Sequence, residues 1–429
     1  MKKKIAVVGG GLTGLVIAYR LGQRGYRVSL FEKADKLGGL LSSFKLEKTY
    51  LEKTYHHIFK TDKEIINLIK ELELENKLVW KDSSIGLYLN KKTYAFVSAI
   101  DLLKFEALPL IDRLRMGMVG LYLQKTTNWK KFEGVSADQW MKKMCGKKAY
   151  ESVWKPLLIG KFHHFYKDVS MAWLWARIHI RGKSSNAFGK EKLGYLEGGF
   201  QLITNKLIKR IDDDGGKIFC KSEVDKIIDN KIWIKGKSRK FEKIICCIDS
   251  NNFAKLIEDN KKINKKYLKK LKSIEYLGAL NLVFTTKQNL SNYYWHNIND
   301  SESPFLAFIQ HTNLIDKKMY GNRHVYYMGT YLSADNNMWK MEDEKIYSLF
   351  LAYLKKIFPA FEAKKIEKKY LFRLEKAQHL VNCDYEKKIP AYKTQLDNVF
   401  LFNFSQIYPE DRGLNYAVKE GNKAIEVLE

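Results

Sequence analysis

The sequence predicts an α/β protein with a parallel sheet, and three features near the start of the chain predict it. A short apolar run at residues 4–8 is followed by the pattern G-x-G-x-x-G at residues 9–14. A helical run at 15–24 and a second apolar run at 28–31 come next. Strand, glycine turn, helix and strand in this order are typical of a Rossmann-like unit that binds a dinucleotide.

Each residue of the glycine turn has its own physical role. Gly9 allows the tight turn, Gly11 lets a diphosphate approach the backbone, and Gly14 lets the helix pack closely on the strand. Leu12 and Thr13 lie where the helix begins, and the unpaired N–H groups and positive dipole end of a helix favour a bound diphosphate. We therefore expect all five residues to contact the dinucleotide.

A carboxylate and a second glycine pair follow the second apolar run. Glu32 lies 18 positions after Gly14, close to the roughly 20 expected for a carboxylate that accepts the ribose hydroxyls. The stretch from Lys33 to Gly38 and Gly39 resembles the start of a large group of FAD-dependent flavoproteins. This group contains amine oxidases, phytoene desaturases, protoporphyrinogen oxidases and UDP-galactopyranose mutase. The resemblance implies FAD as the cofactor, with Lys33, Gly38, Gly39 and Leu40 beside it.

Two later segments carry the same resemblance. Residues 194–201 precede a helical run at 202–211, a glycine loop and a strand pair around Val224, which the resemblance places at the cofactor. Residues 398–404 and 408–418 lead into a final helix. In relatives the N-terminus of that helix points at the flavin ring, which implies that Gly413 and Asn415 offer it backbone N–H groups.

The chain departs from the pattern of this group in two places. Relatives carry an Arg soon after the second glycine pair, where this chain has residues 40–43, Leu-Leu-Ser-Ser. Relatives also carry a Gly-Asp pair after the last strand, where this chain has residues 403–405, Asn-Phe-Ser. The side chains that hold the ribityl chain of the flavin are therefore left open.

The spacing of the strand and helix patterns divides the chain into two discontinuous domains. Residues 1–60, 195–250 and 395–429 are expected to form the Rossmann-like FAD-binding domain. Residues 61–194 and 251–394 are expected to form an inserted α+β substrate domain.

Both pieces of the expected substrate domain show regular patterns. The apolar periods predict helices over 65–74, 99–122 and 135–144, with the Ser136 hydroxyl accepting a hydrogen bond from the first turn of the last one. Strands are predicted over 278–284 and 324–331, and a helix over 345–358 that ends at Pro359.

Composition excludes several classes of protein. With 45% hydrophobic residues in 429, the chain is expected to fold around a buried core. Five scattered cysteines have no metal spacing, so we predict no metal site and a cytoplasmic protein with reduced thiols. There is no C-x-x-x-x-C and no second glycine fingerprint, which argues against a disulfide reductase and against a separate NAD(P) domain.

The formal net charge of +28 comes mostly from lysines spread along the chain, which favours solvated surfaces. A functional alternative is peripheral contact with an anionic membrane surface, such as the inner face of the cytoplasmic membrane. Nucleic-acid binding is not predicted because no recognition motif accompanies the charge. No apolar run reaches about 18 residues, so no membrane-spanning helix is predicted. The oligomeric state is left open.

Three segments contain candidate catalytic residues. His56 and His57 follow the second glycine pair and are similar to the histidine segment of UDP-galactopyranose mutase. Either could hydrogen-bond the flavin or take a proton, with His57 slightly favoured. Arg177 and Arg181 share a helix face and could clamp a carboxylate or phosphate, or could be solvated. Arg412 either neutralises the reduced flavin or pairs with Asp411.

A tandem repeat of the pentad L-E-K-T-Y at residues 46–55 is interpreted as a local hairpin or a chance duplication. It is not expected to be a structural repeat, because equivalent side chains five apart on a strand alternate faces.

The resemblance implies an FAD-dependent oxidoreductase of the dehydrogenase, desaturase or oxidase type. It would move a hydride from a C–H or C–N bond of a small-molecule or lipid-like substrate to the flavin. The alternative is a redox-neutral mutase that acts on a nucleotide sugar, similar to UDP-galactopyranose mutase.

Overall fold

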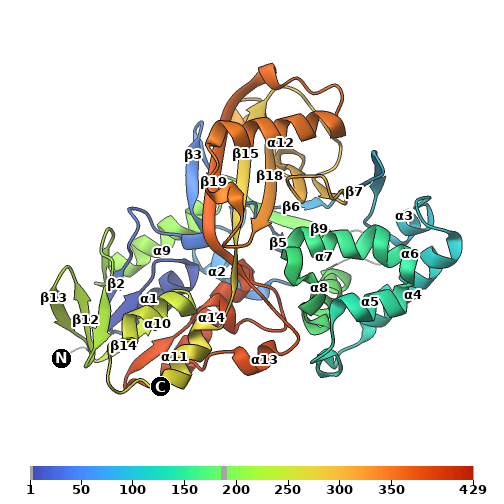
Figure 1. The fold of residues 1–429 in the computed structure, drawn as a ribbon. Helices are drawn as coiled ribbons and strands as arrows, with labels where there is room; N and C mark the ends of the chain where they lie inside the picture. The colour runs from blue at the N-terminus through green and yellow to red at the C-terminus, as the bar shows by residue number, and fades with distance from the viewer. Residues whose placement is uncertain (1–2, 185–190, 429) are drawn as a thin grey trace.

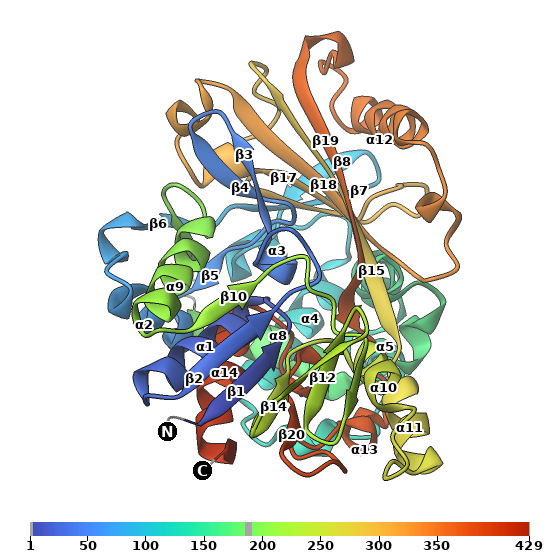
Figure 2. The same ribbon diagram turned by 90° about the vertical axis from the view of Figure 1, so that its left-hand side faces the viewer.

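A parallel five-stranded sheet forms the base of the molecule in the computed structural model, which describes residues 3–184 and 191–428. Its strands are β1 (Lys4–Val8), β2 (Arg27–Phe31), β10 (Lys217–Phe219), β14 (Lys243–Cys246) and β20 (Val399–Leu401), in the order β10-β2-β1-β14-β20 (Figures 1 and 2). The central strand β1 is buried from Ile5 to Val8, because both faces of the sheet are covered.

Helices pack on one face of this sheet and a small antiparallel layer packs on the other. The helices are α1 (Leu12–Gln23), α9 (Gln201–Asp213) and α14 (Leu414–Leu428), whose apolar residues join those of β1 in one core. The opposite layer contains β11 (Lys226–Ile228), β12 (Lys231–Ile234), β13 (Lys237–Lys240), α10 (Ser250–Ile257) and α11 (Lys265–Lys272). The predicted α/β fold with a Rossmann-like parallel sheet is confirmed.

A mixed seven-stranded sheet stands above the parallel sheet (Figure 1). Its order is β19-β15-β18-β17-β16-β7-β8. The bounds are β7 Ile85–Leu89, β8 Lys92–Ala95, β15 Tyr276–Thr286, β16 Trp295–Ile298, β17 Ala307–Gln310, β18 His324–Leu332 and β19 Ile366–His379. Helix α12 (Asp343–Ile357) packs its apolar side on this sheet. The strands predicted over 278–284 and 324–331 lie within β15 and β18.

A helical region extends to one side of the two sheets (Figure 1). Its longer helices are α3 (Ala99–Leu103), α4 (Leu110–Lys125), α5 (Ala137–Cys145), α7 (Lys155–Phe162) and α8 (Met171–Ser184), with the short α6 at Lys147–Ala149.

Two sequence predictions in the helical region are wrong. The single helix predicted over 99–122 is two helices, because Pro109 has no N–H to donate and disfavours helical geometry in the residue before it. Ser136 is at the N-cap of α5, but its hydroxyl donates to Lys167 O at 2.5 Å and does not cap the helix.

The remaining elements connect these parts. The first seven residues of the pentad repeat lie in a hairpin of β3 (Ser43–Leu46) and β4 (Thr49–Glu52), which supports the local-hairpin interpretation. A small antiparallel sheet contains β5 (Ile58–Phe59), β9 (Lys192–Leu196) and β6 (Leu78–Asp82). Helix α2 (Lys63–Glu71) packs beside α14, and the short α13 covers Tyr385–Lys388. In the described part of the chain, no helix is long and apolar enough to cross a membrane.

The parallel order of β1, β2, β14 and β20 places their carboxyl ends on one edge of the sheet. Ligands of open parallel sheets bind at this edge. The loops that leave it contain the glycine turn, Glu32, Asp249 and Asn403.

Candidate active site

The glycine turn after β1 leaves space in front of α1. Gly9 has φ of 108°, which favours glycine, and a Cβ on Gly14 would lie 2.0 Å from Gly9 O. Gly11 instead has φ of −71°, and a Cβ there would meet only Gly39 Cα at 4.0 Å. Glycine is therefore needed at 9 and 14 for the fold, whereas at 11 it keeps open the space before the helix.

The two ends of the turn are tied to their surroundings. Leu12 is buried, and the Thr13 hydroxyl donates to Ala417 O at 3.2 Å, which links α1 to α14. Glu32 accepts hydrogen bonds from Gly10 N at 2.7 Å and from Ala34 N at 2.8 Å. Because each carboxylate oxygen can accept more than one hydrogen bond, Glu32 keeps acceptor capacity for a ribose hydroxyl.

The second glycine pair lies directly against the first turn. Gly38 N donates to Gly10 O at 2.9 Å, and a Cβ on Gly39 would come within 3.1 Å of Gly11 Cα. Leu40 is half-buried against the core of the helical region, and Lys33 is exposed. Ser222 N donates to Glu32 O at 2.9 Å, so the segment leading to the buried Val224 runs beside Glu32.

The first turn of α14 is hydrogen-bonded to the first turns of α1 and α2. Gly413 is exposed, and a Cβ there would meet only Tyr416 Cδ2 at 3.9 Å. The Asn415 side chain accepts from Glu64 N at 2.9 Å and from Ile65 N at 3.3 Å, so it caps α2 from outside that helix. These contacts hold the first turn of α14 in place while its outer side stays open.

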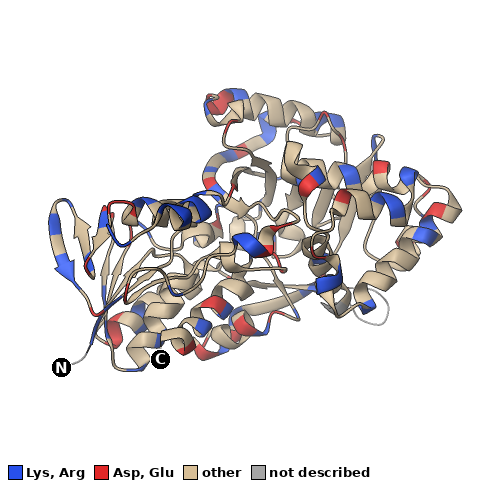
Figure 3. Cartoon of the chain, turned by 60° about the horizontal axis from the view of Figure 1, so that its bottom comes forward, with Lys and Arg blue, Asp and Glu red and all other residues tan. Residues whose placement is uncertain are grey.

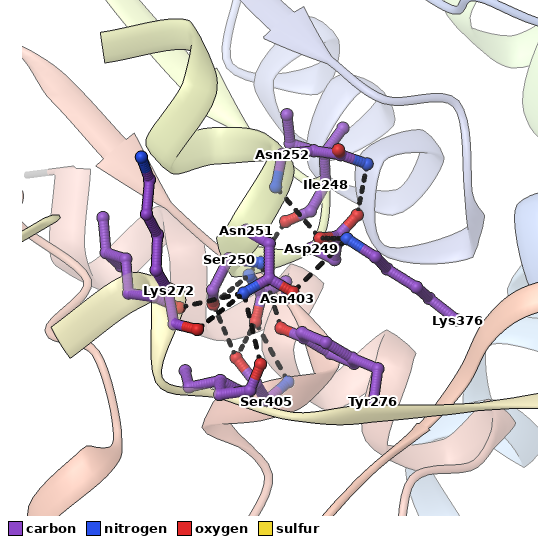
Figure 4. Close-up of polar contacts among 12 residues, drawn as sticks. Ile248, Asp249, Ser250, Asn251, Asn252, Lys272, Tyr276, Lys376, Asn403 and Ser405 are labelled. Carbon is purple, nitrogen blue, oxygen red and sulfur yellow. Dashed lines mark hydrogen bonds and ion pairs between the residues drawn. The ribbon is translucent and has the colours of Figure 1, made fainter. Parts of the chain in front are cut away.

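A different polar network occupies the loop where relatives have a Gly-Asp pair. The Asn403 amide donates to Ile248 O at 2.8 Å, and its Oδ1 accepts from the Ser405 hydroxyl at 2.5 Å (Figure 4). Ser250 and Ser405 hydroxyls lie 2.9 Å apart, and Lys376 pairs with Asp249 at 2.6 Å. Asn403 is thus engaged in joining the loops after β14 and β20, and its buried side chain supplies no carboxylate.

The histidine segment lies between β4 and β5, and both imidazole side chains are half-buried. His56 Nδ1 lies 2.8 Å from Thr54 O and therefore donates to it. His57 Nδ1 lies 3.4 Å from the Tyr294 hydroxyl. Burial, with a smaller contribution from nearby arginines, lowers the pKa of His56 to about 4 and the pKa of His57 to about 3. Both imidazoles are therefore neutral near pH 7, and on His56 the Nε2 atom is left as the acceptor.

A buried carboxylate, Asp411, gathers three cations in front of α14. Its Oδ2 lies 2.7 Å from Arg177 Nη1, 3.0 Å from Lys161 Nζ and 3.7 Å from Arg412 Nη1. Burial alone would raise the pKa of Asp411, but the charges of Lys161, Arg177 and Arg412 hold it well below its usual range. The pKa of Lys161 falls to about 7, because its burial and the two arginines outweigh the one carboxylate.

Arg412 is fixed mainly by groups other than Asp411. Its Nη2 donates to the Tyr331 hydroxyl at 2.7 Å, and its Nε donates to Ala377 O. The ion pair with Asp411 at 3.7 Å is thus one of three contacts that fix the position of this guanidinium.

The structure brings the four candidate catalytic residues into one cluster. Arg412 lowers the pKa of His56, while Arg181 and Arg177 lower that of His57, as neighbouring positive charges do. Sequence reasoning missed Lys161 and Tyr331 as members. The signal for Lys161 was a single lysine inside an apolar and aromatic run at residues 156–162. Nothing in the sequence around Tyr331 indicated more than a position in a strand.

The other histidines do not assemble with metal ligands. His163 Nε2 donates to Tyr331 O at 2.5 Å, and the His179 ring stacks on Trp175 with centroids 4.6 Å apart. Among the residues that the structure describes, no group of three or more His, Cys, Asp or Glu side chains could hold a metal ion.

Comparison with known proteins assigns the family. Residues 12–378 match the model of the flavin containing amine oxidoreductase family, which is most of the chain. The chain belongs to this family. Its cofactor is FAD, and the open space at Gly11 and the backbone-anchored Glu32 fit this dinucleotide.

Two curated relatives that match most of this chain have low sequence identity to it. A 15-cis-phytoene desaturase of Glycine max is 21% identical over 83% of this chain and 66% of its own length. Its counterpart in Solanum lycopersicum is 22% identical over 68% of this chain and 54% of its own length. The chain therefore spans no more than about two thirds of the length of these relatives.

Solved structures show the same fold over nearly the whole chain. A candidate protoporphyrinogen oxidase of Exiguobacterium sp. 255-15 has a TM-score of 0.78 at 14% identity, covering 100% of this chain and 99% of its own. Reduced UDP-galactopyranose mutase gives 0.77 at 14%, covering 100% and 94%. A variant of putrescine oxidase gives 0.75 at 12%, covering 100% and 99%.

A second buried carboxylate explains the glycine pair at 198 and 199. Glu52 accepts from the Tyr195 hydroxyl at 2.5 Å and from Phe200 N at 2.7 Å. Gly199 has φ of 86° and passes so close to β4 that a Cβ would lie 2.6 Å from Tyr50 O. Burial raises the pKa of Glu52 to about 7, against three hydrogen bonds that lower it.

Glu52→Gln should therefore change how stability depends on pH. The pKa of Glu52 is higher in the folded protein than in the unfolded chain. As pH rises from about 4.5 to about 7, the carboxyl therefore ionises in the unfolded chain before it does so in the folded protein, and the wild-type protein loses stability. The variant cannot ionise. The difference in unfolding free energy between variant and wild type should shift in favour of the variant by about 3 kcal/mol between pH 4.5 and pH 8. Denaturant unfolding at both pH values measures this shift, and a difference independent of pH contradicts it.

Proposed function

We propose that this family member is an FAD-dependent dehydrogenase, desaturase or oxidase. It removes a hydride from a C–H or C–N bond of a small-molecule or lipid-like substrate, and the flavin supplies the hydride acceptor. The observation that supports this most is the cluster of His56, His57, Arg177 and Arg412 beside the open start of α14. Neutral hydrogen-bonding groups and fixed cations thus lie together at the carboxyl edge of the sheet.

The cofactor contacts proposed here follow the geometry of the two glycine turns. Leu12 and Thr13, together with Gly9, Gly11 and Gly14, hold the diphosphate through backbone N–H groups at the start of α1. Glu32 accepts from the ribose. Gly413 and Asn415 offer backbone N–H groups at the start of α14, where the positive helix end stabilises negative charge by about 0.3–1 kcal/mol or more. The remaining contacts are assigned to Lys33, Gly38, Gly39, Leu40 and Val224.

The chain's own residues have separate roles in this proposal. His56 and His57 stay neutral at pH 7, so they orient the reacting groups as hydrogen-bond partners and do not act as acids. Arg412 is held by Tyr331 and Ala377, which keeps its positive charge at a fixed position. Arg177 and Lys161 present further positive charge to a substrate anion.

A redox-neutral mutase acting on a nucleotide sugar is the second candidate. Three cations share the single carboxylate Asp411, which leaves an excess of positive charge that suits a diphosphate. This observation favours an anionic substrate under either reaction. The two reactions differ in that only the oxidation consumes an electron acceptor.

Anaerobic mixing of the purified holoprotein with candidate substrates tests the proposal. Isoprenoid, tetrapyrrole or amine donors should bleach the flavin absorbance, and steady turnover should consume an electron acceptor. The result that would overturn it is a prereduced enzyme that turns over a nucleotide sugar without net consumption of an acceptor, with oxidised enzyme unreactive toward the donors.

We also propose a two-domain division and a cytoplasmic location for this chain. Residues 1–60, 195–250 and 395–429 are proposed as the FAD-binding domain and the intervening pieces as the substrate domain. All five cysteines lie in the described part of the chain and are free thiols, which supports a cytoplasmic location. Lysines and arginines are spread along the chain (Figure 3), and it is the excess of positive charge, +28, that supports peripheral contact with an anionic membrane.

A further inference from the structure

Large apolar side chains are exposed together on α3 and α4. Of the 12 large hydrophobic residues that are exposed in the described part of the chain, eight lie on these two helices. We call them the α3–α4 face. Its members are Ile100, Leu103, Leu110, Ile111, Leu114, Met118, Leu121 and Tyr122. The most exposed are Ile111 at 73% and Met118 at 64%. An apolar concentration of this kind marks an interaction surface in a folded protein.

The exposed residues of α4 form one stripe that is held rigidly. Ile111, Leu114, Met118 and Tyr122 recur every three or four positions and so share one side of the helix. On the opposite side, residues 116, 119 and 123 are buried in the core of the helical region. The exposed apolar side of α4 is therefore additional to the side that packs in the core of the helical region.

Arginine contacts fix the neighbouring elements around this stripe. Arg113 donates to Leu108 O at 2.7 Å and to Leu103 O at 2.7 Å, which holds the end of α3 against α4. Arg115 donates to Met144 O at 2.7 Å and to Lys143 O at 2.6 Å, which holds the end of α5 beside α4. The exposed lysines at 142, 143, 147 and 148 therefore border the face.

Positive charge surrounds the α3–α4 face. Residues 99–148 contain ten lysines and arginines and five acidic residues. Lys131 Nζ lies 5.3 Å from the centre of the Tyr122 ring, and Lys125 ends the exposed stripe. The helices lie at the end of the molecule opposite β12 and β13, so a flat partner could reach them (Figure 1).

We propose that the α3–α4 face docks onto the surface of an anionic lipid bilayer. Apolar side chains on a helix that lies in the plane of the interface bury into the acyl boundary, and bordering lysines attract anionic head groups. Each lysine or arginine near such a surface contributes about 1 kcal/mol. A second copy of the chain fits less well, because a two-fold contact through this face would bring the lysine borders of the two copies together.

The test is co-sedimentation of the holoprotein with vesicles of phosphatidylcholine alone and of phosphatidylcholine containing about one third phosphatidylserine. Wild type should bind the anionic vesicles, bind the neutral ones much less, and be released as salt is raised. The double variant Ile111→Glu, Met118→Glu should bind at least tenfold more weakly. Leu349→Glu is the matched control, since Leu349 is 40% exposed on α12, and it should bind like wild type.

Flavin absorbance of each variant establishes that it is folded, independently of vesicle binding. Equal binding of the double variant and wild type would overturn the proposal. So would a wild-type dimer that becomes monomeric in the double variant, measured by analytical ultracentrifugation without lipid, because the occupant of the face would then be another copy of the chain.

Discussion

Gly11→Val should give a folded protein that has lost its flavin. The backbone of Gly11 has φ of −71° and ψ of 175°, which a β-branched residue adopts without strain. A Cβ at this position meets no protein atom closer than 4.0 Å, so the added methyl groups would fill the space that we propose for the diphosphate. We expect FAD affinity to fall by at least about 100-fold, or about 2.7 kcal/mol, measured by fluorescence titration of the apoprotein.

The control for this prediction is the same change at a glycine where no FAD contact is proposed. A Cβ on Gly120 of α4 meets nothing within 4 Å, so Gly120→Val should keep full flavin content. Gly14→Ala differs from both, since its Cβ would lie 2.0 Å from Gly9 O and should destabilise the fold itself. A Gly11→Val protein that purifies with stoichiometric FAD would refute the placement of the diphosphate.

Asp411→Asn should lower the unfolding free energy by about 3–5 kcal/mol near pH 7. Asp411 is only 6% exposed, and the substitution leaves the largely buried charge of Lys161 and the partly exposed charge of Arg177 without their carboxylate. Because the folded pKa of Asp411 is held below its unfolded value, its contribution is present above about pH 4 and is lost as pH falls further. The variant should therefore converge with wild type toward low pH.

Denaturant unfolding at several pH values measures this effect. Glu410→Gln is the matched control, because it removes a carboxylate one position away that makes no ion pair with a described residue, and it should change stability by less than about 0.5 kcal/mol. An Asp411→Asn protein as stable as wild type at pH 7 would show that the cations do not depend on this carboxylate.

Local signals predicted the backbone features that we propose as the cofactor-binding half of the site. The glycine turn, Glu32 and the second glycine pair lie within 39 residues of the N-terminus, and each depends on backbone geometry that glycine or a strand end dictates. Helix α12 and strands β15 and β18 were similarly visible from their periodicity. The helix predicted over 99–122 failed because the apolar period continues across Pro109, which breaks the backbone hydrogen bonding.

Contacts between distant segments could not be predicted from the sequence. Asp411 pairs with Lys161 and Arg177, which lie 250 and 234 positions away along the chain. Asn415 caps a helix 351 positions away, although its sequence neighbourhood indicated only a helix start. Such pairings depend on how α8, α14 and the sheet pack, and no local pattern contains that information.

The central claim is that one FAD lies across the edge of the parallel sheet, between the starts of α1 and α14. The visible absorption spectrum of the purified protein, followed by titration with FAD, tests it most directly. We predict a yellow protein that binds one FAD per chain. A folded protein that is colourless, and stays so after incubation with excess FAD and removal of the unbound cofactor, would contradict the account.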